Sequence, residues 1–136
     1  MNNNDHRLAE AIISDIDQSE DLIAERSFSS VYFGGGTPSL SSVESIKKIL
    51  DVVKNRLEGE ETEITFEMNP NDVSRKKIDG LLTAGVNRIS LGVQSYHDQE
   101  LKALGRGHDS GSILEAKNIL KDTNTTTVSY THLTLP

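Results

Sequence analysis

The stretch Val31-Tyr-Phe-Gly-Gly-Gly-Thr-Pro-Ser39 decides the fold. A short run of strand-forming residues leads directly into three glycines and a polar Thr-Pro-Ser. Glycine tolerates backbone angles and close approaches that other residues do not, so a ligand can lie against bare peptide groups there. Parallel α/β proteins bind ligands at this carboxyl end of their strands. A tight turn stopped by proline is the simpler alternative.

Two further segments repeat the pattern of a strand that ends in polar residues. The segment Glu63-Ile-Thr-Phe-Glu-Met-Asn-Pro70 delivers Glu67 near its end, and Asn87-Arg-Ile-Ser-Leu-Gly-Val-Gln-Ser95 delivers Gln94. Parallel strands end on one rim of their sheet, so these polar groups should gather there.

Helical patterns alternate with the three strands, which predicts right-handed βαβ units and an α/β fold with a parallel sheet. The first helix is expected over 7–25, and the second runs from a Ser41–Glu44 capping box to Gly59. The third starts at Asn71, Asp72 or Ser74 and continues to about Ala84, before Gly85. Two more are expected from Asp98 to near Gly105 and from Asp109 or Ser110 through Leu120. Three strands cannot close a barrel. The chain therefore looks like the middle of a larger parallel (β/α) barrel, cut at both ends.

Composition narrows the class of protein. A length of 136 residues indicates one domain or a piece of one, and 26% charged with 35% hydrophobic residues favours a globular chain over a disordered one. The net charge is −7 with basic residues scattered among acids, which disfavours nucleic acid as a partner. No apolar run is long enough to span a membrane, and the start is not a signal peptide, so we expect a cytoplasmic location. The absence of cysteine excludes disulfides, thiolate metal sites and a cysteine nucleophile within the chain.

Residues 123–136 break the alternation of helices and strands. Six of these fourteen residues are Thr, an abrupt change from residues 1–122, which we assign to the central part of the domain. The tail resembles the translated read-through of a sequencing adapter, and we predict that it is foreign or disordered. By propensity alone, residues 126–135 can instead form one strand.

The rim carries groups suited to a polar small molecule. The glycine run lacks both the P-loop ending and the dinucleotide spacing, so its backbone would hold a zwitterion or a similar ligand, with Thr37 adding a hydroxyl. Glu67 can pair with an amine or accept from ribose hydroxyls, or it is a solvated strand-end carboxylate. Gln94 suits a carboxylate or ribose, or it is a turn amide that caps the next helix.

The segment Leu104-Gly-Arg-Gly-His108 adds a basic group on a short loop. Arg106 can grip a carboxylate through two parallel hydrogen bonds, or it is a surface residue with no role. His108 is either a surface histidine that caps a helix or a site residue. Arg88 lies at the start of its strand, at the opposite face, and we interpret it as structural.

These four motifs together resemble the oxygen-independent coproporphyrinogen III oxidase family of radical S-adenosylmethionine (AdoMet) proteins, over residues 7–122. The Gln-Ser pair at 94–95 and the Leu-Gly-Arg-Gly-His form are more similar to the haem-chaperone branch of that family. The resemblance implies part of an incomplete (β/α)6 barrel that holds a [4Fe-4S] cluster and AdoMet. The reduced cluster cleaves AdoMet to a 5′-deoxyadenosyl radical, with which the oxidases decarboxylate two propionates of coproporphyrinogen III; the chaperone-like members bind haem.

By motif match, the resemblance implies that AdoMet is contacted by Gly35, Gly36, Thr37, Glu67, Gln94 and Arg106. It assigns no catalytic or metal-ligating residue here. The family's three cluster cysteines lie on the loop after its first strand, and this chain is expected to begin after that loop. Without thiolates no cluster is ligated in this chain and no radical forms.

The sequence therefore predicts a fragment of a radical AdoMet protein in porphyrin or haem metabolism, inactive alone, whose partners are AdoMet and a tetrapyrrole. The alternative is a non-catalytic haem chaperone that binds and delivers haem.

Overall fold

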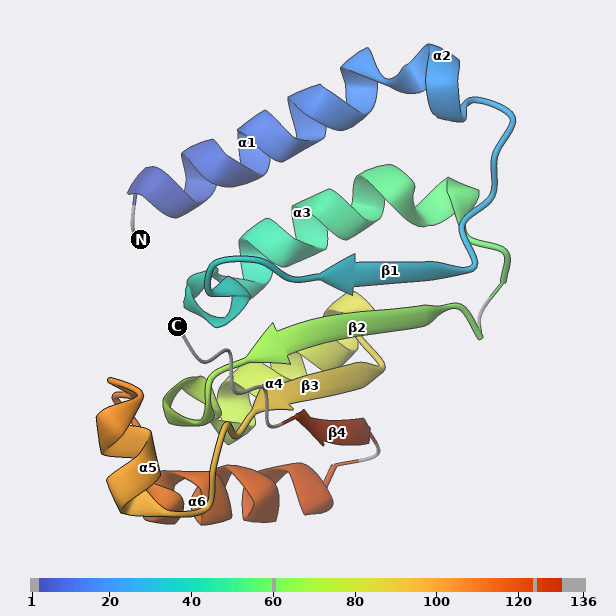
Figure 1. Cartoon of the computed structure of the whole chain (residues 1–136). Coiled ribbons are helices and arrows are strands. Elements are labelled where there is room, and N and C mark those ends of the chain that lie inside the picture. Colours follow the sequence, from blue (N-terminus) through green and yellow to red (C-terminus); the bar gives the residue numbers. More distant parts are fainter. Residues whose placement is uncertain (1–2, 60, 124, 131–136) are drawn as a thin grey trace.

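The computed structural model describes residues 3–59, 61–123 and 125–130. Helices and strands alternate along the chain (Figure 1). The strands are β1 (Ser30–Phe33), β2 (Glu63–Met68), β3 (Arg88–Gly92) and β4 (Thr126–Tyr130). The helices are α1 (Asn3–Gln18), α2 (Glu20–Ile23), α3 (Val43–Val53), α4 (Arg75–Ala84), α5 (Asp98–Ala103) and α6 (Ser110–Lys121), with 3-10 turns at Pro38–Leu40, Lys54–Arg56 and Pro70–Asp72.

The strands form one parallel sheet in the order β1-β2-β3-β4, so sheet neighbours are also neighbours along the chain. A helix separates each pair of consecutive strands, as in a series of βαβ units. The predicted α/β fold with a parallel sheet is confirmed.

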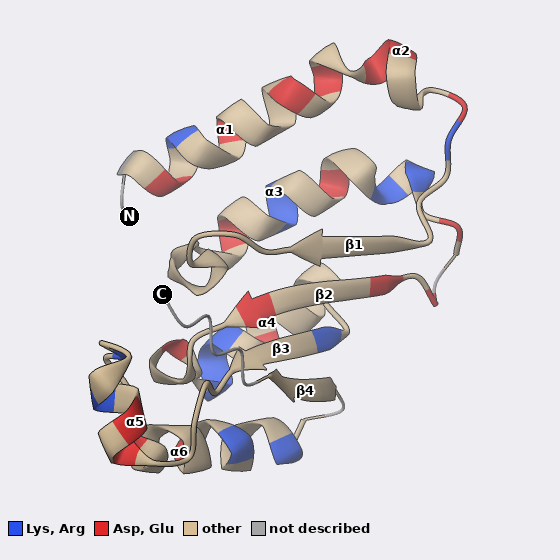
Figure 2. Ribbon diagram, in the orientation of Figure 1, with Lys and Arg blue, Asp and Glu red and all other residues tan. Residues whose placement is uncertain are grey.

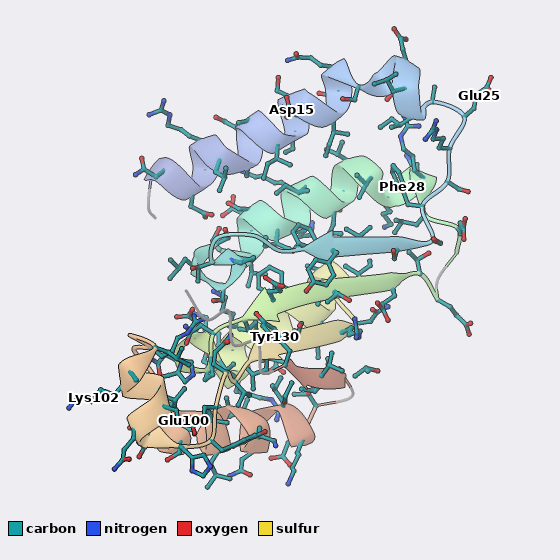
Figure 3. All side chains as sticks on the ribbon, in the orientation of Figure 1. Asp15, Glu25, Phe28, Glu100, Lys102 and Tyr130 are labelled. Atoms are coloured by element: carbon teal, nitrogen blue, oxygen red, sulfur yellow. The ribbon has the colours of Figure 1, made fainter. Side chains whose placement is uncertain are left out.

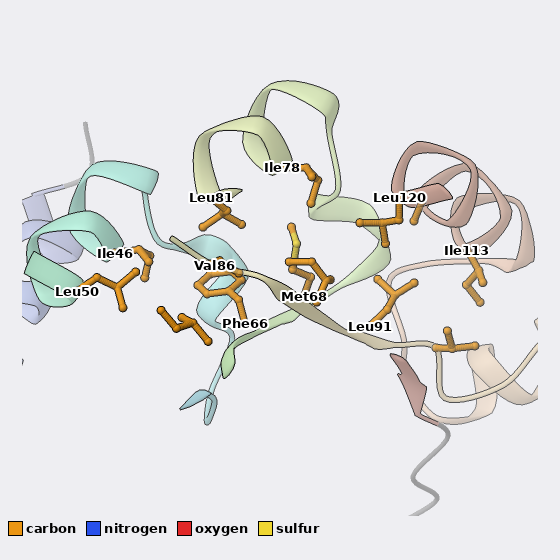
Figure 4. Packing of buried hydrophobic residues seen from close by; sticks show 14 of the residues in the cluster. Ile46, Leu50, Phe66, Met68, Ile78, Leu81, Val86, Leu91, Ile113 and Leu120 are labelled. Carbon is orange, nitrogen blue, oxygen red and sulfur yellow. The ribbon is translucent and has the colours of Figure 1, made fainter. Parts of the chain in front are cut away.

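The core lies between one face of the sheet and helices α3, α4 and α6 (Figure 4). Alternate residues of β2 and β3 point toward these helices because side chains along a strand alternate between its faces. Phe66 of β2 and Leu91 of β3 are fully buried, as are Ile78 and Leu81 of α4. Each such side chain stabilises the fold by about 1.5–3 kcal/mol relative to exposure.

In the part of the chain that the structure describes, the other face of β2 and β3 carries polar side chains such as Thr65, Glu67 and Ser90. Arg88 lies there at the amino end of β3, and its Nη1 is 3.2 Å from both Glu63 Oε1 and Thr65 Oγ1 of β2. These partners place Arg88 at the end of the strands opposite to the glycine run, which agrees with its interpretation as a structural residue. Acidic and basic residues are intermixed along α3 (Figure 2). Within the described residues, no helix has the length and apolar character needed to cross a bilayer.

The start of α3 differs from the predicted capping box. Ser42, not Ser41, is the N-cap, and its side chain accepts from Ser45 N at 3.2 Å. The Ser42 N–H, which a capping-box glutamate would bind, donates instead to Asp5 Oδ2 of α1 at 3.1 Å. Burial raises the pKa of Asp5, but the hydrogen bonds from Ser42 and Ser45 outweigh it and hold the pKa below its ordinary value. A contact from another helix therefore decides where α3 begins.

Three other helix boundaries also differ from expectation. The helix predicted over 7–25 is interrupted by a turn at Ser19, and α3 ends at Val53 before a 3-10 turn rather than at Gly59. Asp98 is the first residue of α5 rather than its cap, because its carboxylate accepts from Ser110 N at 2.8 Å.

The remaining predicted caps are confirmed. Ser74 caps α4, and Gly85 ends that helix with φ of 112°, a left-handed conformation that favours glycine. The side chain of Asp109 caps α6, accepting from Ser112 N at 2.8 Å.

The tail forms a fourth strand within its described part. Residues Thr126–Tyr130 pair in parallel with Arg88–Gly92 over five residues. The count of three strands is therefore wrong. The alternative interpretation of the tail, one strand over residues 126–135, agrees with the structure at residues 126–130. Residues 131–136 lie outside the described residues, and the foreign origin of the tail stays a prediction.

Candidate functional site

The carboxyl ends of the strands meet around one hollow, as predicted. It is lined by Gly36, Thr37, Pro38, Ser39, Glu67, Met68, Asn69, Gly92, Gln94, Arg106 and Tyr130. Five of the six residues expected to contact AdoMet lie together there. The sixth, Gly35, lines an adjacent apolar hollow between β1, α1 and α3.

The glycine run presents bare backbone to solvent. Gly35 and Gly36 have φ of 81° and 59°, a left-handed conformation that side chains rarely adopt. A Cβ built on either residue meets no atom within 4 Å, so the space in front of their peptide groups is open. The backbone needs glycine for its angles, and the open space suits close approach by a ligand.

Ser39 fixes the end of the glycine run to the loop that follows β2. Only 1% of Ser39 is exposed. Its hydroxyl accepts from Asn69 N at 3.2 Å and donates to Asp72 Oδ2 at 2.5 Å, while its carbonyl accepts from Lys77 Nζ. Burial lowers the pKa of Lys77, against the attraction of Asp72 and Asp5. The ends of β1 and β2 are thus joined by a partly buried polar network, and such networks rigidify a site when all members are paired.

Glu67 is held by a tyrosine from the neighbouring strand. Tyr32 OH donates to Glu67 Oε1 at 2.6 Å, and this hydrogen bond, followed by burial, raises the pKa of Tyr32. Tyr130, beside the strand ends in Figure 3, also has a raised pKa, caused first by burial and then by the charge of Glu67, with Arg106 acting in the opposite direction. One carboxylate oxygen of Glu67 is therefore committed to Tyr32.

Gln94 lies in a strained turn at the end of β3. The Ser95 N–H donates to Val93 O at 2.8 Å, which closes a three-residue turn around Gln94. Gln94 has φ of 67° and is the one non-glycine residue with positive φ among the described residues. The side-chain Oε1 is buried with no hydrogen-bond partner in the described part of the chain. Gln94 does not cap the next helix, because Ser95 Oγ accepts from His97 N there.

Arg106 is exposed on the loop between α5 and α6. Its backbone N–H donates to Leu101 O at 2.9 Å, and the loop is joined to the β2 side by Asn71 Nδ2, which donates to Gly107 O at 2.8 Å. In the described residues its guanidinium makes no ion pair. Arg106, without an ion pair in the described residues, thus lines the same hollow as Glu67.

The structure excludes one of the two alternatives for His108, the surface histidine that caps a helix. The residue is 4% exposed, so it is no surface residue, and Asp109 rather than His108 caps the next helix. Its Nε2 lies 3.1 Å from Val93 O, beside Gln94. No periodic pattern in the sequence signals this contact, which arises only when the loop folds back onto the end of β3.

The arrangement is chemically suited to a zwitterion. A carboxylate, a guanidinium, an unpartnered amide oxygen and bare peptide groups converge on the hollow and match an ammonium, a carboxylate and hydroxyls. The cavity volume is only about 80 Å³, against roughly 300–1,000 Å³ for pockets that enclose a small molecule. The described residues therefore form one wall of a site rather than an enclosed pocket.

Comparison with known proteins identifies the family. The profile of the radical SAM superfamily matches residues 6–136. The chain belongs to this superfamily. The chain is 38% identical over 117 residues to the haem chaperone HemW of Haemophilus influenzae. The aligned region is 85% of this chain and 30% of that protein. It is 41% identical over 98 residues to HemW of Escherichia coli, and the aligned region is 71% of this chain and 26% of that protein.

A solved structure supports the same fold. The coproporphyrinogen III oxidase HemN of Escherichia coli, described as a radical SAM enzyme, superposes with a TM-score of 0.79 at 24% identity, covering 93% of this chain and 30% of HemN. The predicted radical SAM type of parallel barrel is confirmed by this match. The chain spans about 30% of the length of the HemW protein of Haemophilus influenzae.

The radical SAM family implies AdoMet and a [4Fe-4S] cluster, and this chain fits the two differently. The open glycine backbone and the unpartnered Oε1 of Gln94 fit a polar ligand such as AdoMet. The chain has no cysteine, and its described residues contain no cluster of three or more His, Asp or Glu side chains able to hold a metal ion. The residues present therefore do not fit the iron–sulfur cluster.

Proposed function

We propose that this chain supplies an AdoMet-binding wall of a radical SAM protein that works in porphyrin or haem metabolism. The observation that carries the proposal is that Glu67, Gln94 and Arg106 line one hollow, and that among the described residues Gln94 Oε1 is buried without a hydrogen-bond partner. A buried acceptor without a partner costs free energy unless a ligand donor satisfies it.

Each group has a distinct part in binding. Glu67 would accept from the ammonium or a ribose hydroxyl of AdoMet, Arg106 would bind its carboxylate, and Gln94 would accept from a ribose hydroxyl. The peptide groups of Gly35 and Gly36 would lie against the ligand. Thr37 adds a hydroxyl at the same rim. Bound AdoMet is the source of the radical in this family, but we assign no radical step to this chain, because it offers no ligands for the cluster.

A non-catalytic haem chaperone is the second candidate. The specific observation that favours it is 38–41% identity to HemW proteins, which are named as haem chaperones. Both candidates share the AdoMet wall and differ in what is done with the tetrapyrrole. A cytoplasmic location stays a prediction from the sequence. Titration of haem into the chain tests the second candidate, because a shift of the Soret band reports binding.

The AdoMet site is tested by titrating AdoMet into the ¹⁵N-labelled chain and following backbone amides by NMR. We expect shifts concentrated at the glycine run, at Gln94 and at Arg106. Gly35→Val should abolish binding, because its side chain fills the open space and strains a positive φ. Arg106→Ala should weaken binding by about 1.5–3 kcal/mol, the scale of a hydrogen bond to a charged group.

Arg88→Ala is the matched control, since Arg88 lies on the same face of the sheet at the opposite end of the strands. Its AdoMet affinity should equal that of the wild type. Equal affinity for wild type and Gly35→Val, or no amide shifts at millimolar AdoMet, contradicts the proposal and returns the glycine run to a plain turn.

A further inference from the structure

We propose that His108 is a positioning residue that holds the strained turn of Gln94 and, through the same contact, fixes the loop that carries Arg106. The inference rests on the proposed function for the identity of the ligand, AdoMet. The contact itself is a property of the fold and is testable without any ligand.

The turn around Gln94 needs an external support. A three-residue turn whose central residue has positive φ is the rare and strained form of the γ-turn. Because glutamine has a Cβ, its φ of 67° is sterically strained, whereas glycine would adopt this angle freely. Such strain persists only where surrounding contacts over-determine the conformation.

His108 supplies that support from the interior. Its Nε2 is 3.1 Å from Val93 O, the same carbonyl that accepts from Ser95 N to close the turn. A carbonyl oxygen only accepts, so Nε2 must carry the proton and donate. Val93 is fully buried and His108 is 4% exposed, so little water competes for this bond. Hydrogen bonds in such surroundings are stronger than those at the surface.

The same bond joins two parts of the rim. His108 comes two residues after Arg106, on the loop between α5 and α6, whereas Val93 follows β3. The histidine thus ties the loop of Arg106 to the turn of Gln94. Asn71 Nδ2 holds the neighbouring Gly107 O from the β2 side, at an exposed position. The buried contact of this loop is therefore the hydrogen bond from His108 to Val93, just after β3.

The consequence is a preorganised acceptor. Gln94 lines the hollow, and among the described residues its Oε1 is buried without a partner; a fixed turn therefore holds this amide in place before a ligand hydroxyl arrives. Preorganisation of this kind improves affinity by reducing the ordering cost of binding. His108 touches no ligand in this proposal and acts through Gln94 and Arg106.

The anchor is tested first without ligand. A long-range ¹H–¹⁵N spectrum of the wild-type chain should show His108 with its proton on Nε2, and an unprotonated Nε2 overturns the proposal. Hydrogen exchange of the Ser95 amide should become about tenfold faster in His108→Leu. It should stay near the wild-type rate in His108→Gln, whose amide can still donate. His97→Leu, at an exposed histidine nearby, is the matched control and should leave that rate unchanged.

The positioning role is tested next with AdoMet. His108→Leu should weaken AdoMet binding about tenfold, and His108→Gln should restore most of it. Gln94→Gly should raise the thermal midpoint, because glycine accepts the positive φ, and should still weaken binding. Faster Ser95 exchange with unchanged affinity in His108→Leu overturns the positioning role. If wild type binds no AdoMet, the proposed function fails, and the exchange and tautomer measurements still decide the anchor. If His108→Leu does not fold, His108→Gln and the wild-type tautomer decide it.

Discussion

Strands β3 and β4 lie side by side in one parallel ladder, yet their side chains have opposite surroundings. Ile89 and Leu91 of β3 are fully buried against the helices. Their register partners in β4, Thr127 and Ser129, are exposed. The backbone of β3 pairs in parallel with β4 on one side, as it does with β2 on the other. Pairing and burial are therefore separable, and β4 is a strand that contributes little to the core.

This difference has a plain physical basis. Strands of a parallel sheet that are covered by helices are usually rich in Val, Ile and Leu. The helix-facing positions of β4 are instead hydroxyl residues beside a hollow that reaches Leu120 of α6. The opposite face of β4 contributes Tyr130 to the site. The helix-facing side of β4 is therefore held mainly by its backbone ladder with β3, whereas β3 also packs its apolar side chains against the helices.

The largest expected effect concerns the origin of the tail. We predict that resequencing the locus gives a different frame after Asp122, with apolar residues where Thr127 and Ser129 now stand. Two buried aliphatic side chains would add about 3–6 kcal/mol to the stability of the fold. A native frame that runs unchanged through Thr-His-Leu-Thr-Leu-Pro at 131–136 would refute this and make the polar strand genuine.

The next prediction compares how much a buried side chain of β3 and its partner in β4 contribute to stability. Leu91→Ala should destabilise the chain by about 2–5 kcal/mol, because it leaves a cavity in the core. Ser129→Ala, at the register partner in β4, should change stability by less than about 0.5 kcal/mol. Urea unfolding followed by circular dichroism gives both values. Similar costs for the two variants would remove the distinction between the strands.

A smaller effect should come from giving β4 an apolar side chain. Thr127→Ile should stabilise the chain by about 0.5–1.5 kcal/mol, as part of the new side chain packs against Leu120 in the hollow beside α6. Thr126→Ile is the control, because Thr126 pairs with Arg88 and faces the open side of the sheet. Thermal unfolding should separate the two variants, and equal midpoints would count against the packing argument.

The smallest effect concerns the face of the sheet on which Tyr130 of β4 lines the candidate site. A hydrogen bond to Glu67 raises the pKa of Tyr32, and burial followed by the charge of Glu67 raises that of Tyr130. Because these folded-state pKa values are raised, the stability they contribute is present below about pH 10 and is lost as the pH rises through them. Glu67→Gln should lower both values toward the ordinary one, more for Tyr32, as measured by phenolate absorbance. Tyr96→Phe removes the third tyrosine from the signal and serves as the control.

Much of the fold follows from local chemistry. The glycine run, the polar strand ends and the caps at Ser74, Gly85 and Asp109 act over a few residues, so the sequence predicts them. The gathering of Glu67 and Gln94 at one hollow follows from parallel topology alone. Their role toward AdoMet stays a prediction.

The errors arose from contacts between distant segments. Ser42 begins α3 because Asp5, 37 residues away, takes its N–H. His108 is buried because its loop returns to Val93, 15 residues earlier. The fourth strand was predicted only as the alternative for the tail, because its composition lacks the apolar residues that usually accompany burial. None of these contacts leaves a periodic pattern that composition or spacing reveals.

The agreement between sheet order and chain order has a consequence for synthesis on the ribosome. Each strand pairs only with the strands immediately before and after it in the chain. A nascent chain can therefore seat each strand on the preceding one as it emerges, without waiting for a distant partner or threading between finished strands. Of the four described strands β4 emerges last, and by then the ends of β1, β2 and β3 that line the hollow are already in place.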